Sequence, residues 1–124
     1  MKAAVLHQYG GELKIENVDL EEPRKGEVRV KMKAAGVCHS DQHVIDLTLP
    51  LPVPIILGHE GAGVVDAVGE GVTNVKVGDH VALNWVPACT DCHYCRTGRP
   101  DMCDEAAKIA GMGTLLDGTT RFSQ

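Results

Sequence analysis

Four of the five cysteines lie within fifteen residues, and their spacing is typical of a metal site. They form a C-x2-C-x2-C-x7-C pattern made of Cys89, Cys92, Cys95 and Cys103. A C-x2-C pair lets two thiolates of one turn face the same ion, and four thiolates complete the tetrahedral shell of a structural zinc site. Because such a shell has no open position, we predict a zinc ion that stabilises a lobe with little apolar content of its own.

Two other interpretations of this cysteine cluster remain to be compared with zinc. An iron–sulfur electron carrier also uses four cysteines, but the ferredoxin pattern places the fourth three residues after the third and follows it with proline. Here the fourth cysteine comes after seven residues and is followed by Asp104. The other interpretation is a set of free thiols or disulfides, and disulfides are rare in a reducing cytoplasm. The spacing therefore favours zinc.

The fifth cysteine, Cys38, and a distant histidine, His59, are candidates for a second site with different chemistry. Both lie in glycine-containing segments, and each has a carboxylate nearby, Asp41 or Glu60, that could orient a metal ligand. Taken separately, Cys38 could be a buried free thiol and His59 a histidine of the core or of a turn. Together they would supply two of the three protein ligands of a catalytic zinc site, whose fourth position stays open for water or an alcohol.

Ser40 and His43 could provide a path for a proton beside such a site. A zinc ion acts as a Lewis acid on an alcohol oxygen, and the proton of the alcohol must then leave. Ser40 carries a hydroxyl two residues after Cys38, and His43 lies about one helical turn further on. The structural alternatives are a helix N-cap for Ser40 and a surface position for His43. We interpret three other histidines as surface or turn residues: His7, His80 and His93.

Strands are the main elements that must position these residues. The chain has 124 residues, of which 44% are hydrophobic, 23% are charged and 14 are glycine, as expected for one globular domain. We expect strands over 4–6, 13–18 and 28–34. In the last of these, apolar residues alternate with Arg29, Lys31 and Lys33, which predicts a half-buried strand with one solvated basic face.

The rest of the chain predicts short helices, loops and tight turns. Residues 40–46 and 105–110 could each form a short helix. Prolines at alternate positions predict an extended loop over 49–55. The glycines and valines of 58–78 predict strands joined by tight turns, and 77–80 predicts a hairpin that leads into 81–83.

The overall composition disfavours several classes of function. A net charge of −5 without a basic stripe argues against a nucleic-acid binder. No apolar run approaches the length needed to span a bilayer, and the apolar stretch at the N-terminus is too short for a signal peptide. We therefore expect no membrane partner and a cytoplasmic location. No G-x-G-x-x-G follows a predicted strand, so the sequence contains no dinucleotide-binding signal.

Three separated motifs together resemble one known family. The pattern G-H-E-x2-G-x5-G-x2-V is matched by Gly58, His59, Glu60, Gly63, Gly69 and Val72. With segment 36–43 before it and the four cysteines after it, the chain resembles the N-terminal catalytic domain of zinc-dependent alcohol dehydrogenases, in the medium-chain dehydrogenase/reductase superfamily. Residues 87–121 resemble its class III-like and nitrosodimethylaniline-dependent branch.

This resemblance implies a fold and a set of roles. The fold would be mainly β, a GroES-like twisted β-barrel with short helices and a structural-zinc lobe at 89–103, over residues 1–124. Cys38 and His59 would be ligands of the catalytic zinc, with Glu60 beside the metal and Asp41 holding His59. Ser40 and His43 would carry the proton relay.

The resemblance also implies where substrate and cofactor would bind. Trp85 would line the pocket for a small alcohol or aldehyde. His39 stands where the family often has an arginine that contacts the cofactor pyrophosphate, and a histidine is a weaker, pH-dependent partner for phosphate.

In this family the third catalytic-zinc ligand, the nucleotide-binding Rossmann domain and the last barrel segment lie further along the chain. We therefore expect the N-terminal part of a longer enzyme, truncated and inactive alone. The intact enzyme would oxidise a primary alcohol to an aldehyde with hydride transfer to NAD, and we expect it to be a homo-oligomer. A non-enzymatic, zinc-stabilised GroES-like binding module remains an alternative, because a fold alone does not establish a function.

Overall fold

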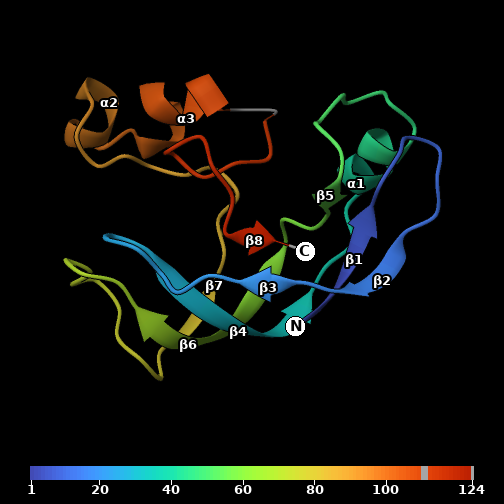
Figure 1. Cartoon of the computed structure of the whole chain (residues 1–124). Coiled ribbons are helices and arrows are strands. Elements are labelled where there is room, and N and C mark those ends of the chain that lie inside the picture. Colours follow the sequence, from blue (N-terminus) through green and yellow to red (C-terminus); the bar gives the residue numbers. More distant parts are fainter. Residues whose placement is uncertain (110–111, 124) are drawn as a thin grey trace.

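The chain folds into small antiparallel sheets with three short helices around them (Figure 1). The computed structural model describes residues 1–109 and 112–123. The strands are β1 (Lys2–Leu6), β2 (Lys14–Asn17), β3 (Asp19–Leu20), β4 (Val28–Ala35), β5 (Ile55–Ile56), β6 (Gly61–Val68), β7 (His80–Ala82) and β8 (Phe122–Ser123). The helices are α1 (His39–Ile45), α2 (His93–Arg96) and α3 (Asp104–Ile109), with a 3-10 turn at Pro100–Met102. The predicted mainly β, GroES-like fold with short helices is confirmed.

The first sheet joins β1, near the N-terminus, to β5, which lies shortly before His59. Its strand order is β2–β1–β5, and Val5 of β1 pairs with Ile56 of β5. The N–H of Gly10 donates to the carbonyl of Ile45, 2.6 Å away, and so joins the turn after β1 to the end of α1. Figure 1 shows α1 beside this sheet, on the opposite side of the molecule from α2 and α3. The sheet therefore fixes α1 close to the chain that leads into His59.

The second sheet has the order β4–β6–β7, and β6 is its central strand. Two glycines of this region allow very close approach of backbones. A Cβ added to Gly63 would lie 2.4 Å from the carbonyl oxygen of Lys31, and one added to Gly69 would lie 1.8 Å from that of Arg24. Since real Cβ atoms do not come this close to backbone, the sheet and the turn after it require glycine at both positions.

Burial along β4 differs from the prediction of a half-buried strand. Val28 is 39% exposed and Met32 is 44% exposed. The pairing of β4 with β6 shifts twice, between Arg29 and Val30 and again between Met32 and Ala34. A bulge breaks the strict alternation of faces, so the period-2 pattern does not correspond to one buried face. Of the expected basic face, Lys31 and Lys33 are exposed.

The segment after His59 contains one long strand rather than several. β6 covers 61–68, and 69–79 is loop and turn. The N–H of Val72 donates to Gly69 and that of Asp79 donates to Lys76, which leaves too few residues between the two turns for another strand. At 77–80 the chain forms a turn that leads into β7, as predicted, but no strand directly precedes this turn. The strand that pairs with β7 is β6, across the whole segment 69–79, and the N–H of Gly78 donates to the carbonyl of Val65.

The remaining predictions for local structure hold in outline. Residues 49–54 form the expected loop, and β5 begins at Ile55. The helix expected at 105–110 is α3, Asp104–Ile109; residue 110 lies outside the described residues. No helix in the described ranges is long and apolar enough to cross a membrane.

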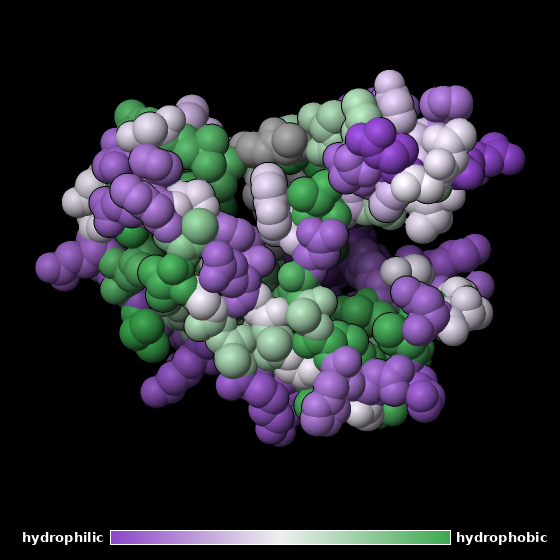
Figure 2. Space-filling model, turned by 180° about the vertical axis from the view of Figure 1, so that it is seen from behind, coloured by the Kyte–Doolittle hydropathy of each residue, from purple (hydrophilic) through white to green (hydrophobic). Residues whose placement is uncertain are grey.

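The buried core is small. Its fully buried side chains are Leu6 and Val65, and other buried apolar residues are Val5, Val18, Val44, Cys103 and Ala106. Many large apolar side chains are exposed instead, among them Ile15 on β2 and Met32 on β4. Figure 2 shows apolar residues gathered in patches on one face of the molecule.

Candidate functional site

The four clustered cysteines converge on one point, as their spacing predicts. The Sγ atoms of Cys89, Cys92, Cys95 and Cys103 lie within 4.8 Å of one another, and none forms a disulfide. We call residues 89–103 the cysteine lobe. Helix α2 begins directly after Cys92 and includes Cys95, and the 3-10 turn ends directly before Cys103. Short helical turns, rather than a core, therefore set the positions of the thiols.

Backbone amides of the cysteine lobe are directed at its sulfur atoms. Cys89 N–H donates to Cys103 Sγ at 3.3 Å, and Ala106 N–H donates to the same sulfur at 3.5 Å. These two bonds lower the pKa of Cys103 to about 6. Burial, and after it the neighbouring thiol of Cys92, raises the pKa of Cys95 to about 12. Four close thiols thus do not all ionise by themselves, and a bound cation would supply the missing positive charge.

The donor set of the cysteine lobe fits zinc. Four sulfur donors at mutual contact distance, without disulfides and with amide donors around them, match a tetrahedral thiolate site. All four positions are occupied by protein atoms, so the site has no place for a substrate. The three histidines that we interpret as surface or turn residues lie outside both donor groups. His80 and His93 are exposed, and His7 pairs with Glu16 at 2.9 Å.

The second group of donors comes from segments that are far apart in the sequence. Cys38 lies between β4 and α1, while His59 and Glu60 lie between β5 and β6. One donor atom from each lies within 4.8 Å of the other two, and we call these three residues the open donor group. A thiolate, an imidazole and a carboxylate fit a zinc site that keeps a position for another ligand.

The start of α1 explains how Cys38 and Asp41 are held. Cys38 is the N-cap residue, and its N–H donates to Asp41 Oδ2 at 3.0 Å. The alternative interpretation of Ser40 as the N-cap is therefore wrong, because the helix begins one residue before it. Asp41 Oδ1 also lies 3.4 Å from His59 Nδ1. One carboxylate thus connects both donors, and it leaves the other ring nitrogen of His59 facing the group.

Ser40 contacts two residues of the open donor group, Cys38 and His59. Its hydroxyl donates to Cys38 Sγ at 3.2 Å, and its Oγ is 3.3 Å from His59 Nε2. The Ser40 hydroxyl is the main cause that lowers the pKa of Cys38, followed by the Ser40 amide and His59. The hydrogen bond with Cys38 raises the pKa of His59, and the charge of Asp41 adds to this rise. Without a metal, the thiol and the imidazole therefore form a polarised pair.

Of three other sequence candidates, the structure brings Trp85 into contact with this group, whereas His39 and His43 contact each other. The Trp85 ring is 6.1 Å from the His59 ring, in an edge contact, and the residue is 70% exposed. His39 and His43 stack on each other with ring centroids 4.6 Å apart. His43 Nδ1 is buried without a hydrogen-bond partner among the described residues, and none of their hydrogen bonds joins His43 to Ser40.

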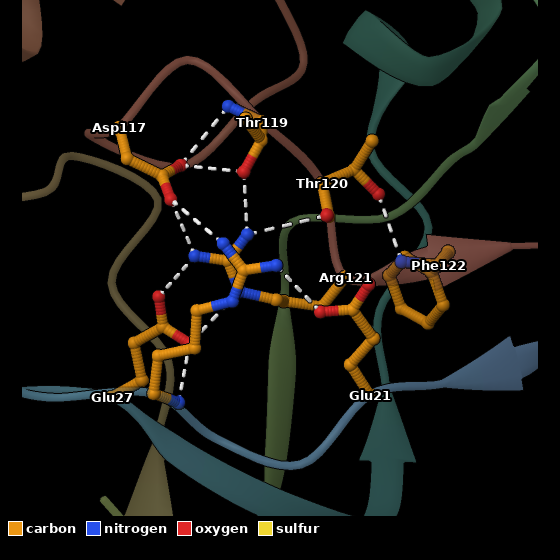
Figure 3. Close-up of polar contacts among 8 residues, drawn as sticks. Glu21, Glu27, Asp117, Thr119, Thr120, Arg121 and Phe122 are labelled. Carbon is orange, nitrogen blue, oxygen red and sulfur yellow. Dashed lines mark hydrogen bonds and ion pairs between the residues drawn. The ribbon is translucent and has the colours of Figure 1, made fainter. Parts of the chain in front are cut away.

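Sequence reasoning missed a buried arginine that joins the two halves of the chain (Figure 3). Arg121 is 7% exposed, and its guanidinium forms ion pairs with Glu27 and Asp117. The Glu21 N–H also donates to the Arg121 carbonyl at 3.0 Å. The hydrogen bond with Arg121 is the main cause that lowers the pKa of Glu27, and likewise that of Asp117. The four-residue spacing of Asp117 and Arg121 was the available signal, but Glu27 lies too far away in the sequence to be paired with them in advance.

Comparisons with known proteins agree with this geometry. Residues 24–121 match the family described as "Alcohol dehydrogenase GroES-like domain". The chain is 53% identical over 121 residues to an NDMA-dependent alcohol dehydrogenase of Amycolatopsis methanolica, covering 98% of this chain and 32% of that protein. It is 45% identical over 123 residues to an S-(hydroxymethyl)glutathione dehydrogenase of Candida maltosa, with the same two coverages.

Solved structures give the same result. An alcohol dehydrogenase zinc-binding domain protein from Burkholderia ambifaria superposes with a TM-score of 0.90 at 40% identity, over 99% of this chain and 33% of that one. The benzyl alcohol dehydrogenase of Acinetobacter calcoaceticus superposes with a TM-score of 0.89 at 37% identity, over 98% and 33%.

The chain belongs to the alcohol dehydrogenase GroES-like domain family, as the sequence resemblance implied. It spans about a third of the length of the curated relatives that it matches. Nothing in these matches supports an iron–sulfur carrier or a non-enzymatic module.

Proposed function

We propose that this chain is the zinc-binding catalytic part of an alcohol dehydrogenase that oxidises a primary alcohol to an aldehyde and passes the hydride to NAD. The observation that carries the proposal is the open donor group: a thiolate, an imidazole and a carboxylate meet within 4.8 Å, beside a hydroxyl that contacts two of them. Closed structural sites also use thiolates and imidazoles, but protein atoms fill all four of their positions and they need no hydroxyl beside the donors. Two of the proteins described above are named as alcohol dehydrogenases, the NDMA-dependent enzyme and the benzyl alcohol dehydrogenase, and they support the same reaction.

In this proposal the residues of the open donor group and those next to it have distinct tasks, and Glu60 would lie beside the metal. Zinc bound there would act as a Lewis acid that makes the alcohol hydroxyl more acidic. Cys38 and His59 would hold the metal, and Asp41 would fix the ring of His59 through Nδ1. The Ser40 hydroxyl, 3.2 Å from Cys38 Sγ, would take up the proton of the alcohol as it releases its own proton, and His43 would carry the released proton toward solvent. The alcohol carbon then loses a hydride, so the two hydrogens leave as one proton and one hydride.

The remaining residues would bind the reactants. Trp85 lies beside His59 and would line the apolar side of the substrate pocket. His39 would contact the phosphates of the cofactor when its ring is protonated. The cysteine lobe would hold its own zinc ion and would take no part in the reaction. A homo-oligomeric state of the intact enzyme is part of the proposal.

The proposal is tested on the intact protein that carries this chain. We expect it to oxidise primary alcohols with NAD, or with N,N-dimethyl-4-nitrosoaniline as the electron acceptor that the name of one relative suggests. Cys38→Ser should abolish this turnover and remove one zinc ion while the cysteine lobe keeps its own. The 124 residues by themselves should show no turnover. Wild-type turnover in Cys38→Ser, or full zinc content in it, would contradict the proposal.

A further inference from the structure

Gly36 faces Glu60 at the end of the pairing between β4 and β6. The last paired residues of the two strands are Ala35 and Gly61, so Gly36 and Glu60 are the next residues outward. The N–H of Gly36 donates to the carbonyl of Glu60 at 2.7 Å, which continues the ladder by one bond. Gly36 therefore lies opposite the one carboxylate of the open donor group.

No side chain can stand on Gly36 while Glu60 keeps its position. A Cβ built on Gly36 would lie 2.1 Å from Glu60 Oε2, 3.2 Å from its Cδ and 3.0 Å from its Cβ. Directly opposed residues of an antiparallel pair usually have Cβ atoms about 4.5–5.5 Å apart. The two strands are thus closer together here than in an ordinary antiparallel pair. The carboxyl group of Glu60 occupies the space that a side chain on Gly36 would need.

Backbone conformation does not account for this glycine. Other glycines in the chain, such as Gly26 and Gly78, have positive φ angles of 78° and 95°, where a side chain would be strained, and nothing lies within 4 Å of a Cβ built on them. Gly36 shows the opposite combination, since its φ lies outside that range and its neighbour is very close. What position 36 requires is space.

We propose that Gly36 is a positioning residue for Glu60: the space above it holds the Glu60 carboxylate beside the metal ligands Cys38 and His59. This inference rests on the proposed function, because it assumes that the open donor group binds a metal. The Glu60 side chain is exposed and flexible, so water would otherwise compete for its carboxylate. The charge of Glu60 acts on both Cys38 and His59, which agrees with a carboxylate held close to each of them.

The inference separates the effect of Gly36→Ala on metal binding from its effect on stability. The closest atom to the new Cβ is the far end of a flexible side chain, so the Glu60 carboxylate would swing away. Glu60 Cβ, 3.0 Å from the new Cβ, cannot rotate away, so the two strand ends would also separate by a few tenths of an ångström. Replacing glycine by alanine also reduces the conformational freedom of the unfolded chain, which offsets part of any strain. We expect Gly36→Ala to stay folded and to bind metal more weakly at the open donor group.

The test is a titration with Co²⁺ of the intact protein whose cysteine lobe is filled with zinc. The signal is the thiolate-to-cobalt absorption that Cys38→Ser removes. We expect Gly36→Ala and Glu60→Ala each to weaken Co²⁺ binding about 10-fold, the usual scale for a residue that supports a metal ligand. The double variant should bind no more weakly than Glu60→Ala alone, because the carboxylate that the new methyl group displaces is then missing.

Gly11→Ala is the matched control. Gly11 also has ordinary φ, and a Cβ on it would lie 3.0 Å from both the side chain and the carbonyl oxygen of Gln8, a residue outside the open donor group. This variant should bind Co²⁺ like the wild type. Additive losses in the double variant, or wild-type binding in Gly36→Ala, would overturn the role of Gly36 while leaving the proposed function intact. Absence of any absorption that depends on Cys38 would overturn both.

Discussion

The cysteine lobe and the open donor group differ in how the chain brings their donor atoms together. All four thiols of the lobe lie within fifteen residues, and turns adjacent in the sequence present them. The open donor group combines Cys38 with His59 and Glu60, which depend on the β4–β6 pairing and on the start of α1. The lobe offers only sulfur, whereas the open group offers three kinds of donor. The difference shows that a group of like donors can be assembled from neighbouring turns, while the group of unlike donors in this chain depends on the tertiary structure.

The strongest test of this contrast removes one thiol from each group. Cys103→Ser should lose the zinc of the cysteine lobe and unfold the lobe, because binding contributes on the order of 10–16 kcal/mol in small zinc domains and few apolar contacts replace it. Cys38→Ser should lose only the other metal and keep the lobe folded. Zinc content and limited proteolysis within 89–109 measure both effects. Equal protection of the lobe in the two variants would remove the distinction between the sites.

A second prediction concerns the ion pairs that attach the chain after the lobe to the chain before β4. Arg121→Met leaves Glu27 and Asp117 without their shared partner, so we expect a clear fall in the melting temperature. Arg29→Met is the control, since Arg29 is also paired with two carboxylates but its side chain is 29% exposed. Its melting temperature should fall much less. Thermal unfolding of both variants, with zinc content checked, decides whether burial makes the difference.

A third prediction sharpens the description of the open donor group. Asp41→Asn keeps an acceptor for the Cys38 amide but removes the charge beside His59 Nδ1. We expect metal binding by the open group to weaken about 10- to 100-fold, with the lobe unaffected. Asp46→Asn is the matched control. Asp46, at the other end of α1, accepts a hydrogen bond from the Thr48 N–H and is not part of the open donor group. If the two variants bind Co²⁺ equally well, Asp41 does not orient His59.

The smallest effect that we predict is a dependence of the protein's stability on pH, which comes from Glu27 in its ion pair with Arg121. The folded pKa of Glu27 lies below its ordinary value of 4.5, so the stability that it contributes is present above that pH and is lost as the pH falls through the folded pKa. Wild type should therefore exceed Glu27→Gln in stability near neutral pH, and the gap should narrow steadily below about pH 4. Denaturant unfolding of both proteins at several pH values measures the gap, and a gap independent of pH would show that the ion pair contributes nothing.

Some local patterns predicted the structure well, and others failed for identifiable reasons. The loop with alternate prolines, the turn that leads into β7 and the helix after Cys103 depend on neighbouring residues, and they were predicted correctly. The alternation along β4 predicted a strand, but two register shifts changed which side chains are buried. Ser40 had the residue type of an N-cap, yet Cys38 takes that position because Asp41 accepts its amide. In the first failure a strand distant in the sequence decided the outcome. In the second, a side chain three residues away decided it by accepting a hydrogen bond.

By itself, the sequence determined the family, the mainly β fold class and the convergence of the four cysteines, because these depend on residue types and on spacings of a few residues. The family resemblance already placed Glu60 beside Cys38 and His59, but only the tertiary structure decided that Gly36 leaves room for its carboxylate and that Arg121 pairs with Glu27. The physical reason is that these contacts join residues from about twenty to more than ninety positions apart. Their distances depend on strand register and bulges, which alternation of residue types does not specify.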